Sequence, residues 1–579
     1  MLAGLLVYSG VRAADTVDVQ VEGLETELEE NVRAFLSIVE RSEPQDEEDE
    51  EAAPLNEAAI RRLHRRAPEE IRKALQPFGY YSPAIETNLE GGDGSWRATY
   101  AVDPGAPTRL AQVEIRVEGE ARDLPDVKSL LADADIEPGD VLSHPAYERV
   151  KNGLLEAVYS AGYLDAAWRR SEMLVEPDRR RARIFLVLES GRRYYFGDIR
   201  IEQDILNQDF VERYNDIEPG EPFDTDRLID LQLDLSSSDY FSAVDVQAHR
   251  DEAADFRVPV TIRTEPRKPQ HYTFGVGYGT DTGARVSFGT EFRRINRRGH
   301  QFRLDVQLSE IRNAFTAQYH VPIENVVTDR MTYFSSLQQV EIGDADSDLF
   351  SVGATREENW RGLRRRLYLR FDRENYMFGG QPGDSASLLY PGINITWQRA
   401  DDPLFPRRGL SVSFDLHGSV ENPLSETTFV QSTLGARAVL PLGERGRLLL
   451  RGEAGATRAA NFFRSLPPSQ RFFTGGDRTV RGYGYQELSP QDDAGNDVGG
   501  QYMAAGSVEV DYLVKGNFGL AAFFDSGNAA STPDADLLNS VGLGLRYRSP
   551  VGMIRLDVAH PLDDPDTDFR LHISLGPDL

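Results

Sequence analysis

The sequence predicts three N-terminal α+β repeats followed by a C-terminal transmembrane antiparallel β-barrel of about 16 strands. Two observations lead to this fold class. A short tyrosine-containing element recurs at intervals of roughly 80 residues in the first half of the chain. From His271 onward, apolar and polar residues alternate with a period of two. No segment of the expected mature chain approaches the roughly 20 apolar residues of a membrane helix. A membrane-embedded form must therefore be a closed barrel.

Composition excludes several classes of function. The chain has 579 residues, a formal net charge of -30 and no cysteine. The acidic balance argues against nucleic-acid binding, which requires clustered Lys and Arg. Without cysteine there are no disulfides, thiolate metal ligands or cysteine nucleophiles. The histidines are too scattered for a metal-binding helix motif. We therefore expect no metal, no cofactor and no enzymatic activity.

The N-terminus resembles a secretory signal. Residues 1–14 contain a short apolar run followed by Val11-Arg12-Ala13, a small-residue cleavage pattern. We expect cleavage near Ala13 or Ala14 and export of the chain from the cytoplasm. An apolar N-terminus that is not cleaved is the alternative.

The first half reads as three copies of one small domain. The recurring elements are Gly79-Tyr80, Gly162-Tyr163 and Asp239-Tyr240, and Ile136–Asp140 recurs as Ile217–Glu221. Each copy parses as strand, helices, strand, strand. In the second copy the predicted elements are strand 110–117, helix 147–162 and a last strand 182–188. The predicted domains are 15–104, 105–191 and 192–266, with the barrel at 267–579.

The first repeat departs from this pattern at an acidic run, residues 43–51. Such a run repels itself, and we interpret it as a solvated insertion, with a docking site for a basic partner as the alternative. The repeats themselves carry small sheets with free edges, which suit strand addition by passing polypeptides. Inert spacers are the other interpretation.

Strand after strand in the second half has one apolar and one polar face, as in Phe302–Ser309 and Leu410–His417. A soluble sandwich shows similar alternation. The barrel is favoured because the pattern persists without a helix and aromatic residues lie near strand ends. These aromatic residues are Tyr272, Tyr278, Trp397 and Tyr547.

Several motif-like features are better explained structurally. Gly-x-Gly at Gly277 and Gly542 lies inside strands and opens no helix, so we interpret these glycines as bends or loosened edges instead of phosphate loops. Asp-rich segments at 344–348 and 492–497 have no EF-hand spacing and are interpreted as hairpin loops, with calcium binding as the alternative.

The stretch Gly475–Tyr485 places one arginine, Arg481, among glycines and aromatic residues. If it lies inside the barrel, this charge needs carboxylate partners. Strand phase supplies two. Apolar positions flanking Asp525 and Asp557 face lipid, so both carboxylates face the lumen. We predict a charge-assisted contact between Arg481 and one of them. The alternative is that Arg481 only solvates a loop tip.

Three motifs resemble one known family. Val480-Arg481-Gly482-Tyr483 is similar to the signature of the inward-folded sixth loop in the outer-membrane assembly superfamily that includes BamA, TamA and two-partner secretion transporters. Phe523–Asn528 resembles its FxDxG strand motif, and Gly542–Asp557 its penultimate-strand signature. The resemblance implies that the repeats are POTRA domains, that residues around 471–500 fold into the barrel, and that Asp525 is the preferred partner of Arg481.

The number of repeats, three, and the ending Leu575–Leu579 resemble TamA-like members. The resemblance implies a bacterial outer-membrane factor with periplasmic POTRA domains that helps insert or secrete β-barrel proteins such as autotransporters. A TamB-like inner-membrane-anchored partner and a lateral gate between the first and last strands are also implied. The expected gate residues are Tyr272, Gly275, Gly277, Gly279, Phe569, Leu571, Ile573 and Leu575. A BamA-like general insertase, a two-partner secretion pore and a plain porin are the alternatives.

Overall fold

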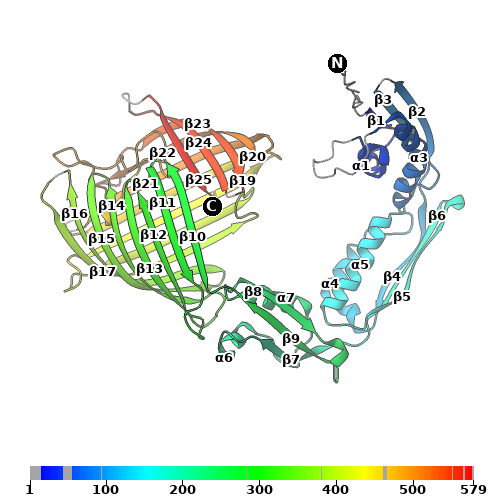
Figure 1. The fold of residues 1–579 in the computed structure, drawn as a ribbon, viewed down its shortest axis with the longest axis horizontal. Coiled ribbons are helices and arrows are strands. Elements are labelled where there is room, and N and C mark those ends of the chain that lie inside the picture. The colour runs from blue at the N-terminus through cyan, green and yellow to red at the C-terminus, as the bar shows by residue number, and fades with distance from the viewer. Residues whose placement is uncertain are drawn as a thin grey trace, which may run out of the picture. The chain divides into compact units, whose positions relative to one another are not determined.

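The computed structural model describes the chain except for residues 1–14, 43–54, 93, 282, 380, 461–465, 551, 565–567 and 577–579. The predicted signal and the acidic run both lie outside the described residues. The chain divides into two compact units, one holding the first two sheets and the other holding the barrel, with the third sheet shared between them (Figure 1). No helix in the described ranges is long and apolar enough to cross a membrane.

The first half forms three three-stranded sheets with the orders β1-β3-β2, β4-β6-β5 and β7-β9-β8. In the first two sheets the last strand lies in the middle, parallel to the first and antiparallel to the second. The strands are β1 Thr16–Glu22, β2 Ala84–Gly92, β3 Ser95–Asp103, β4 Arg109–Glu118, β5 Ala167–Glu176, β6 Arg181–Glu189, β7 Tyr195–Glu202, β8 Phe241–Ala248 and β9 Arg257–Pro266.

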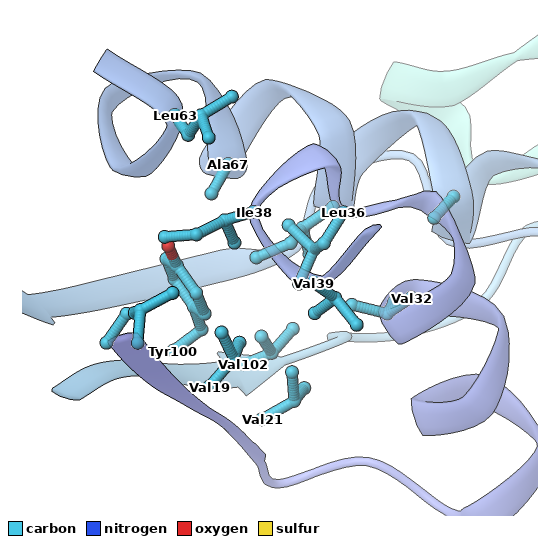
Figure 2. Packing of buried hydrophobic residues seen from close by; sticks show 14 of the residues in the cluster. Val19, Val21, Val32, Leu36, Ile38, Val39, Leu63, Ala67, Tyr100 and Val102 are labelled. Atoms are coloured by element: carbon cyan, nitrogen blue, oxygen red, sulfur yellow. The ribbon is translucent and has the colours of Figure 1, made fainter. Parts of the chain in front are cut away.

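Helices cover one face of each small sheet. They are α1 Thr26–Phe35, α2 Ser37–Glu40, α3 Glu57–Leu75, α4 Pro125–Ala132, α5 His144–Ser160, α6 Gln208–Val211 and α7 Thr225–Ser237. In α3, Ile60, Leu63, Ala67 and Ile71 recur every three or four residues and are buried. Figure 2 shows Leu63 and Ala67 of α3 on one side of a buried cluster and Val19, Val21 and Val102 of the strands on the other, with Ile38 between them. Side-chain caps at Asn56 and Ser143 begin α3 and α5.

The recurring element marks the same turn in each repeat. The residue before the tyrosine has a left-handed backbone in all three copies: Gly79 (φ 88°), Gly162 (φ 90°) and Asp239 (φ 64°). The first two glycines also lie against the next repeat. The Gly79 carbonyl accepts from the Thr108 N–H at 2.8 Å, and the Gly162 carbonyl accepts from the Tyr194 N–H at 2.8 Å. The repeated turn therefore forms the joint between successive domains.

The second half is a 16-stranded antiparallel sheet whose strands follow one another in chain order from β10 to β25. The predicted fold class, three α+β repeats and a barrel of about 16 strands, is confirmed. The strands are β10 Gln270–Gly279, β11 Gly283–Phe292, β12 Gln301–Ser309, β13 Arg312–Pro322, β14 Arg330–Ile342, β15 Ala345–Trp360, β16 Leu363–Phe378, β17 Asp384–Ala400, β18 Gly409–Ser419, β19 Phe429–Leu442, β20 Gly446–Ala459, β21 Tyr502–Lys515, β22 Phe518–Ala530, β23 Leu538–Ser549, β24 Gly552–Pro561 and β25 Arg570–Gly576.

Many of the exposed side chains of this sheet are large apolar ones. In β22, Leu520 and Phe524 are exposed, whereas Ala521, Phe523 and Asp525 are buried. A soluble protein would show the opposite arrangement, with its apolar face covered. The apolar exterior and polar interior are those of a barrel in lipid.

Candidate functional site

The chain between β20 and β21 folds into the barrel. The described part of this inward loop, residues 466–501, has buried apolar, polar and basic side chains, including Leu466, Gln470, Arg471, Val480 and Arg481. The Val480 side chain packs with Tyr483 and Leu488 in a small apolar cluster. This cluster holds the adjacent arginine in place inside the lumen.

Arg481 is 4 % exposed and is surrounded by carboxylates. Its Nε and Nη2 donate to the two oxygens of Asp525 at 2.7 and 2.9 Å, a bidentate pair. Its Nη1 donates to Glu509 at 2.8 Å and to Asp557 at 3.0 Å. The structure thus brings Arg481 to both carboxylates that strand phase indicated. Burial alone would lower the pKa of Arg481, but these carboxylates raise it above its ordinary value.

A second arginine, Arg546, joins this network. Arg546 on β23 is 2 % exposed and donates to Glu509 at 2.6 Å and to Asp557. Two guanidinium groups therefore share three carboxylates in a region closed to water. Ser507 adds a hydrogen bond to Asp525 at 2.5 Å and accepts one from Arg481 at 3.2 Å. A network satisfied in this way is rigid, because each group would be costly to leave unpaired.

The residues of the FxDxG motif on β22 either contact the lumen network or leave room for the loop that carries Arg481. In the FxDxG motif, Phe523 lies under Arg481, with the guanidinium carbon 3.3 Å from the ring centroid, a cation–π contact. Gly527 leaves room for Val480, since a Cβ there would lie 2.9 Å from its side chain.

The glycines of β23 serve the same purpose. A Cβ on Gly542 would lie 2.1 Å from the Phe523 ring, and one on Gly544 would lie 1.9 Å from Asp557. Gly542 and Gly544 do not loosen the strand edge, as the sequence suggested, because β23 pairs continuously with β22 and β24 through both positions. They make room for the lumen network instead.

Further contacts hold the backbone on either side of Arg481. Gly482 has φ 97°, and its N–H donates to Nε2 of His572 on β25 at 2.9 Å. Arg451 on β20 donates to the Thr479 carbonyl at 3.2 Å. The Tyr483 hydroxyl lies 3.5 Å from the Asn539 carbonyl. The loop thus contacts β20 to β25 around the charged network.

The inward loop is also attached to strands on another part of the wall. His417 on β18 and the Gln470 side chain lie 3.1 Å apart, and Gln431 on β19 donates to the Gln470 carbonyl at 2.9 Å. Arg471 donates to the carbonyls of Leu466 and Val498 at 2.8 Å each. The loop therefore bridges the lumen and does not line only one side of it.

The predicted gate strands are the two ends of the strand order. Tyr272 is 59 % exposed in β10, and Leu571 is 48 % exposed in β25. Gly275, Gly277 and Gly279 lie in β10, Ile573 and Leu575 lie in β25, and Phe569 lies one residue before β25. In the described part of the seam, the Ile573 N–H donates to the Thr280 hydroxyl at 3.1 Å, and each end strand has its backbone ladder on its other side.

The two Asp-rich segments meet each other. Asp344 accepts a hydrogen bond from the Asp497 N–H at 2.6 Å, and Asp492 accepts from Ala494 and Asn496 within its own turn. The group of His and acidic ligand atoms close enough to hold a cation in the described ranges is a different one, Asp281, Asp477 and His572.

Three α+β repeats, a 16-stranded lipid-exposed barrel and an arginine-bearing loop inside it define the architecture of an outer-membrane POTRA-and-barrel protein. The Omp85 superfamily domain model matches residues 269–578, and the model of TamA POTRA domain 1 matches residues 18–104. The chain belongs to the Omp85 superfamily. It is an outer-membrane protein with its POTRA domains in the periplasm.

Two curated relatives are outer membrane protein assembly factors named BamA. The one from Nitratidesulfovibrio vulgaris is 26 % identical over 65 % of this chain and 50 % of its own length. The one from Neisseria meningitidis serogroup B is 22 % identical over 88 % of this chain and 72 % of its own length. The chain thus spans about half of the first relative and almost three quarters of the second.

The fold also matches a solved structure. The BamA crystal structure from Haemophilus ducreyi lacking POTRA domains 1–3 has a TM-score of 0.66 with 14 % identity, over 81 % of this chain and 99 % of that one. At this identity the likeness concerns the fold.

Sequence reasoning missed most of the lumen network. Glu509, Arg546, Ser507 and His572 were not singled out, although each lies at a polar position in an alternating strand. Strand phase could have placed Glu509 between Val508 and Val510, and Arg546 between Leu545 and Tyr547. It could not have shown that these strands meet around one arginine, because that requires the barrel to be assembled.

Proposed function

We propose that this chain is a TamA-like translocation and assembly factor that helps insert or secrete β-barrel proteins, autotransporters among them, through a lateral gate between β10 and β25. The observation that carries this proposal is the pair of end strands. Each has a backbone ladder on one side, and the one hydrogen bond described between them uses a side-chain hydroxyl. Such edges can template a strand of an incoming protein.

The gate strands are suited to opening. β10 carries three glycines in ten residues, Gly275, Gly277 and Gly279, and β25 has seven residues, whereas β17 has seventeen. Short strands with few side-chain contacts have little pairing to lose on separation. Client folding itself supplies the driving force, and no nucleotide or metal takes part.

The POTRA sheets supply a second set of edges in the periplasm. The edge strand β2 is largely exposed along its length, and β5 alternates between exposed and half-buried residues. We propose that they add strands of clients before these reach the barrel. The match of residues 18–104 to TamA POTRA domain 1 supports pairing with a TamB-like, inner-membrane-anchored subunit. Copurification of that subunit with the full chain tests this partner.

A BamA-like general insertase is the second candidate. It is favoured by the names of the curated relatives. The two candidates differ in their clients. A general insertase restores many outer-membrane proteins in cells depleted of their own insertase, whereas a TamA-like factor affects a restricted set. Three POTRA sheets argue against a two-partner secretion pore, for which two are expected.

A seam-locked variant tests the gate. Thr280→Cys and Ile573→Cys place two thiols where a hydrogen bond already joins the strands, and the natural chain has no other cysteine. We expect the oxidised protein in liposomes to lose assembly of an autotransporter client and to recover it after reduction. Assembly is measured as folded, protease-protected client.

The matched control places the same thiols within one hairpin. Val276 and Val286 are direct partners in β10 and β11, so a disulfide there leaves the seam free. Equal client assembly by the oxidised seam-locked and hairpin-locked proteins would overturn the gate.

A further inference from the structure

The tip of the inward loop contacts both strands of the seam through one residue, Asp477. This aspartate lies four residues before Arg481 and is partly buried. Its carboxylate and its backbone N–H each have partners on the hairpin that follows β10, and its carboxylate has another on β25. Asp477 thus hydrogen-bonds to both sides of the seam.

On the first-strand side, Thr280 and Asp281 hold the tip. The Thr280 hydroxyl donates to the Asp477 carboxylate at 3.2 Å, and the same hydroxyl accepts from Ile573 N–H of β25 at 3.1 Å. The Asp281 carboxylate accepts from the Asp477 N–H at 2.7 Å. Burial and the neighbouring Asp477 charge raise the pKa of Asp281 to about 6.

On the last-strand side, His572 holds the tip. Its Nδ1 lies 2.6 Å from the Asp477 carboxylate, and its Nε2 lies 2.9 Å from the Gly482 N–H. A backbone N–H can only donate, so Nε2 is an acceptor and the ring proton is on Nδ1. The neutral imidazole therefore donates to Asp477 and accepts from the loop two residues beyond Val480.

This proton assignment argues against a metal ion at the cluster. The ligand atoms of Asp281, Asp477 and His572 lie within 4.8 Å of one another. A cation bound at Nδ1 would displace the ring proton to Nε2, where it would face the Gly482 N–H, donor against donor. The geometry fits hydrogen bonding better than coordination.

The loop is held firmly enough for its tip to constrain the seam. Arg451 donates to the carbonyls of Asp477 and Thr479 at 3.5 and 3.2 Å. Beyond the tip, Glu487 of the loop accepts from Arg570 at the start of β25 at 2.8 Å. Movement of either seam strand away from the other must break contacts to a loop that the Arg481 network fixes in the lumen.

We propose that Asp477 is a latch residue, which holds the first and last strands together at the extracellular end of the seam until the loop tip is released. The latch is a property of the seam itself. Its role as a restraint on the lateral gate rests on the proposed function.

Distance measurement across the seam tests the latch without any client. Nitroxide labels at Tyr278→Cys and Leu571→Cys, both exposed positions on β10 and β25, report the separation in the full chain in nanodiscs. The labels distinguish molecules with a short, closed distance from those with a long, open one. We expect Asp477→Ala to raise the population of open molecules relative to closed ones about ten-fold, the effect of losing one charge-assisted hydrogen bond. Arg478→Ala changes an exposed neighbour at the same tip and should leave the ratio unchanged.

Two further measurements separate the latch from a general loss of structure. Labels at Leu520→Cys and Leu571→Cys span the continuous sheet from β22 to β25, and Asp477→Ala should not alter their distance. Thr280→Val, which keeps the side-chain shape, should also open the seam. Seam distances unchanged in both Asp477→Ala and Thr280→Val would overturn the latch.

The same distance measurement with added Zn²⁺ or EDTA decides whether a bound cation, instead of hydrogen bonds, joins Asp281, Asp477 and His572. We expect Zn²⁺ and EDTA to leave the seam distances of the natural sequence unchanged. A Zn²⁺-dependent shortening that Asp281→Asn abolishes would replace the hydrogen-bonded latch by a coordinated cation. Seam opening in Asp477→Ala with unaltered client assembly would retain the latch and count against the proposed gate.

Discussion

At the scale of single residues, the lumen network shows how an expensive charge is kept inside a barrel. Arg481 by itself would be costly to bury, and its three carboxylate neighbours would be costly without it. The network therefore specifies one position of the loop more than it adds stability. The motif residues around it, Phe523, Gly527 and Gly544, are there because they stack against or make room for these groups.

Removal of Arg481 tests this account. Arg481→Ala leaves Glu509 and Asp557 paired with Arg546 but removes the bidentate partner of buried Asp525, and we expect a loss of roughly 3–5 kcal/mol in stability. Arg481→Lys keeps the charge but loses the bidentate fork, so its stability should lie between those of the natural sequence and Arg481→Ala. The measurement is the temperature at which the barrel loses its compact migration in detergent gels. Arg478→Ala, on the exposed side of the same loop, is the control.

A double-mutant cycle then isolates the pair. If Arg481→Ala and Asp525→Ala destabilise independently, with no coupling energy, the contact does not fix the loop.

The sequence predicted Arg481 and two of its partners because strand phase is readable from alternation. Glu509 and Arg546 have the same signal, but nothing in the sequence indicates that β21 and β23 face the same arginine. His572 was read as one of the scattered histidines, since its role appears only when β25 lies beside the loop tip.

At the scale of elements, alternation and helical spacing predicted the type of the segments that were assigned, such as the helix at 147–162 and the strands at 302–309 and 410–417. Register and pairing were not readable. A period of two says which side chains face lipid, but the same pattern fits a strand with one ladder or with two. The seam between β10 and β25 is therefore a property of the assembled sheet. The reach of the inward loop to Gln431 and His417 was equally hidden, because a loop has no period.

The repeated turn of the POTRA domains is the element whose sequence signal has the clearest physical cause. Gly162 has φ 90°, and a Cβ there would lie 2.4 Å from the Phe223 carbonyl oxygen of the next repeat. We expect Gly162→Ala to destabilise the POTRA repeats by about 1–3 kcal/mol or more, from backbone strain and the clash together. The helices lie in the first half of the chain, so thermal loss of the helical circular dichroism signal measures it.

Gly139→Ala is the matched control for that prediction. Gly139 has φ 105° but no heavy atom within 4 Å of the added Cβ, so it carries strain without the clash. Equal unfolding temperatures for the two variants would show that the contact between repeats contributes nothing.

At the scale of the whole molecule, the count of repeats, the strand number and the envelope location were all accessible from periodicity, motif resemblance and the absence of cysteine. Periodicity cannot show whether a client passes along the barrel axis or through the barrel wall. The inward loop and the end strands β10 and β25, each with a backbone ladder on one side in the described residues, are the features that support the proposed lateral exchange over conduction along the barrel axis. The place at which a client strand enters the barrel therefore tests the proposed function most directly.

Trapping of a client at the seam measures this directly. A single cysteine at Val276 on β10, in a chain with no other thiol, is offered to an autotransporter client carrying one cysteine in its last strand. We predict a mixed disulfide during assembly at Val276→Cys and none at Leu434→Cys, which is also an exposed apolar position but lies on β19, far from the seam along the strand order. Disulfides formed equally at both positions, or at neither while the client assembles, would contradict it.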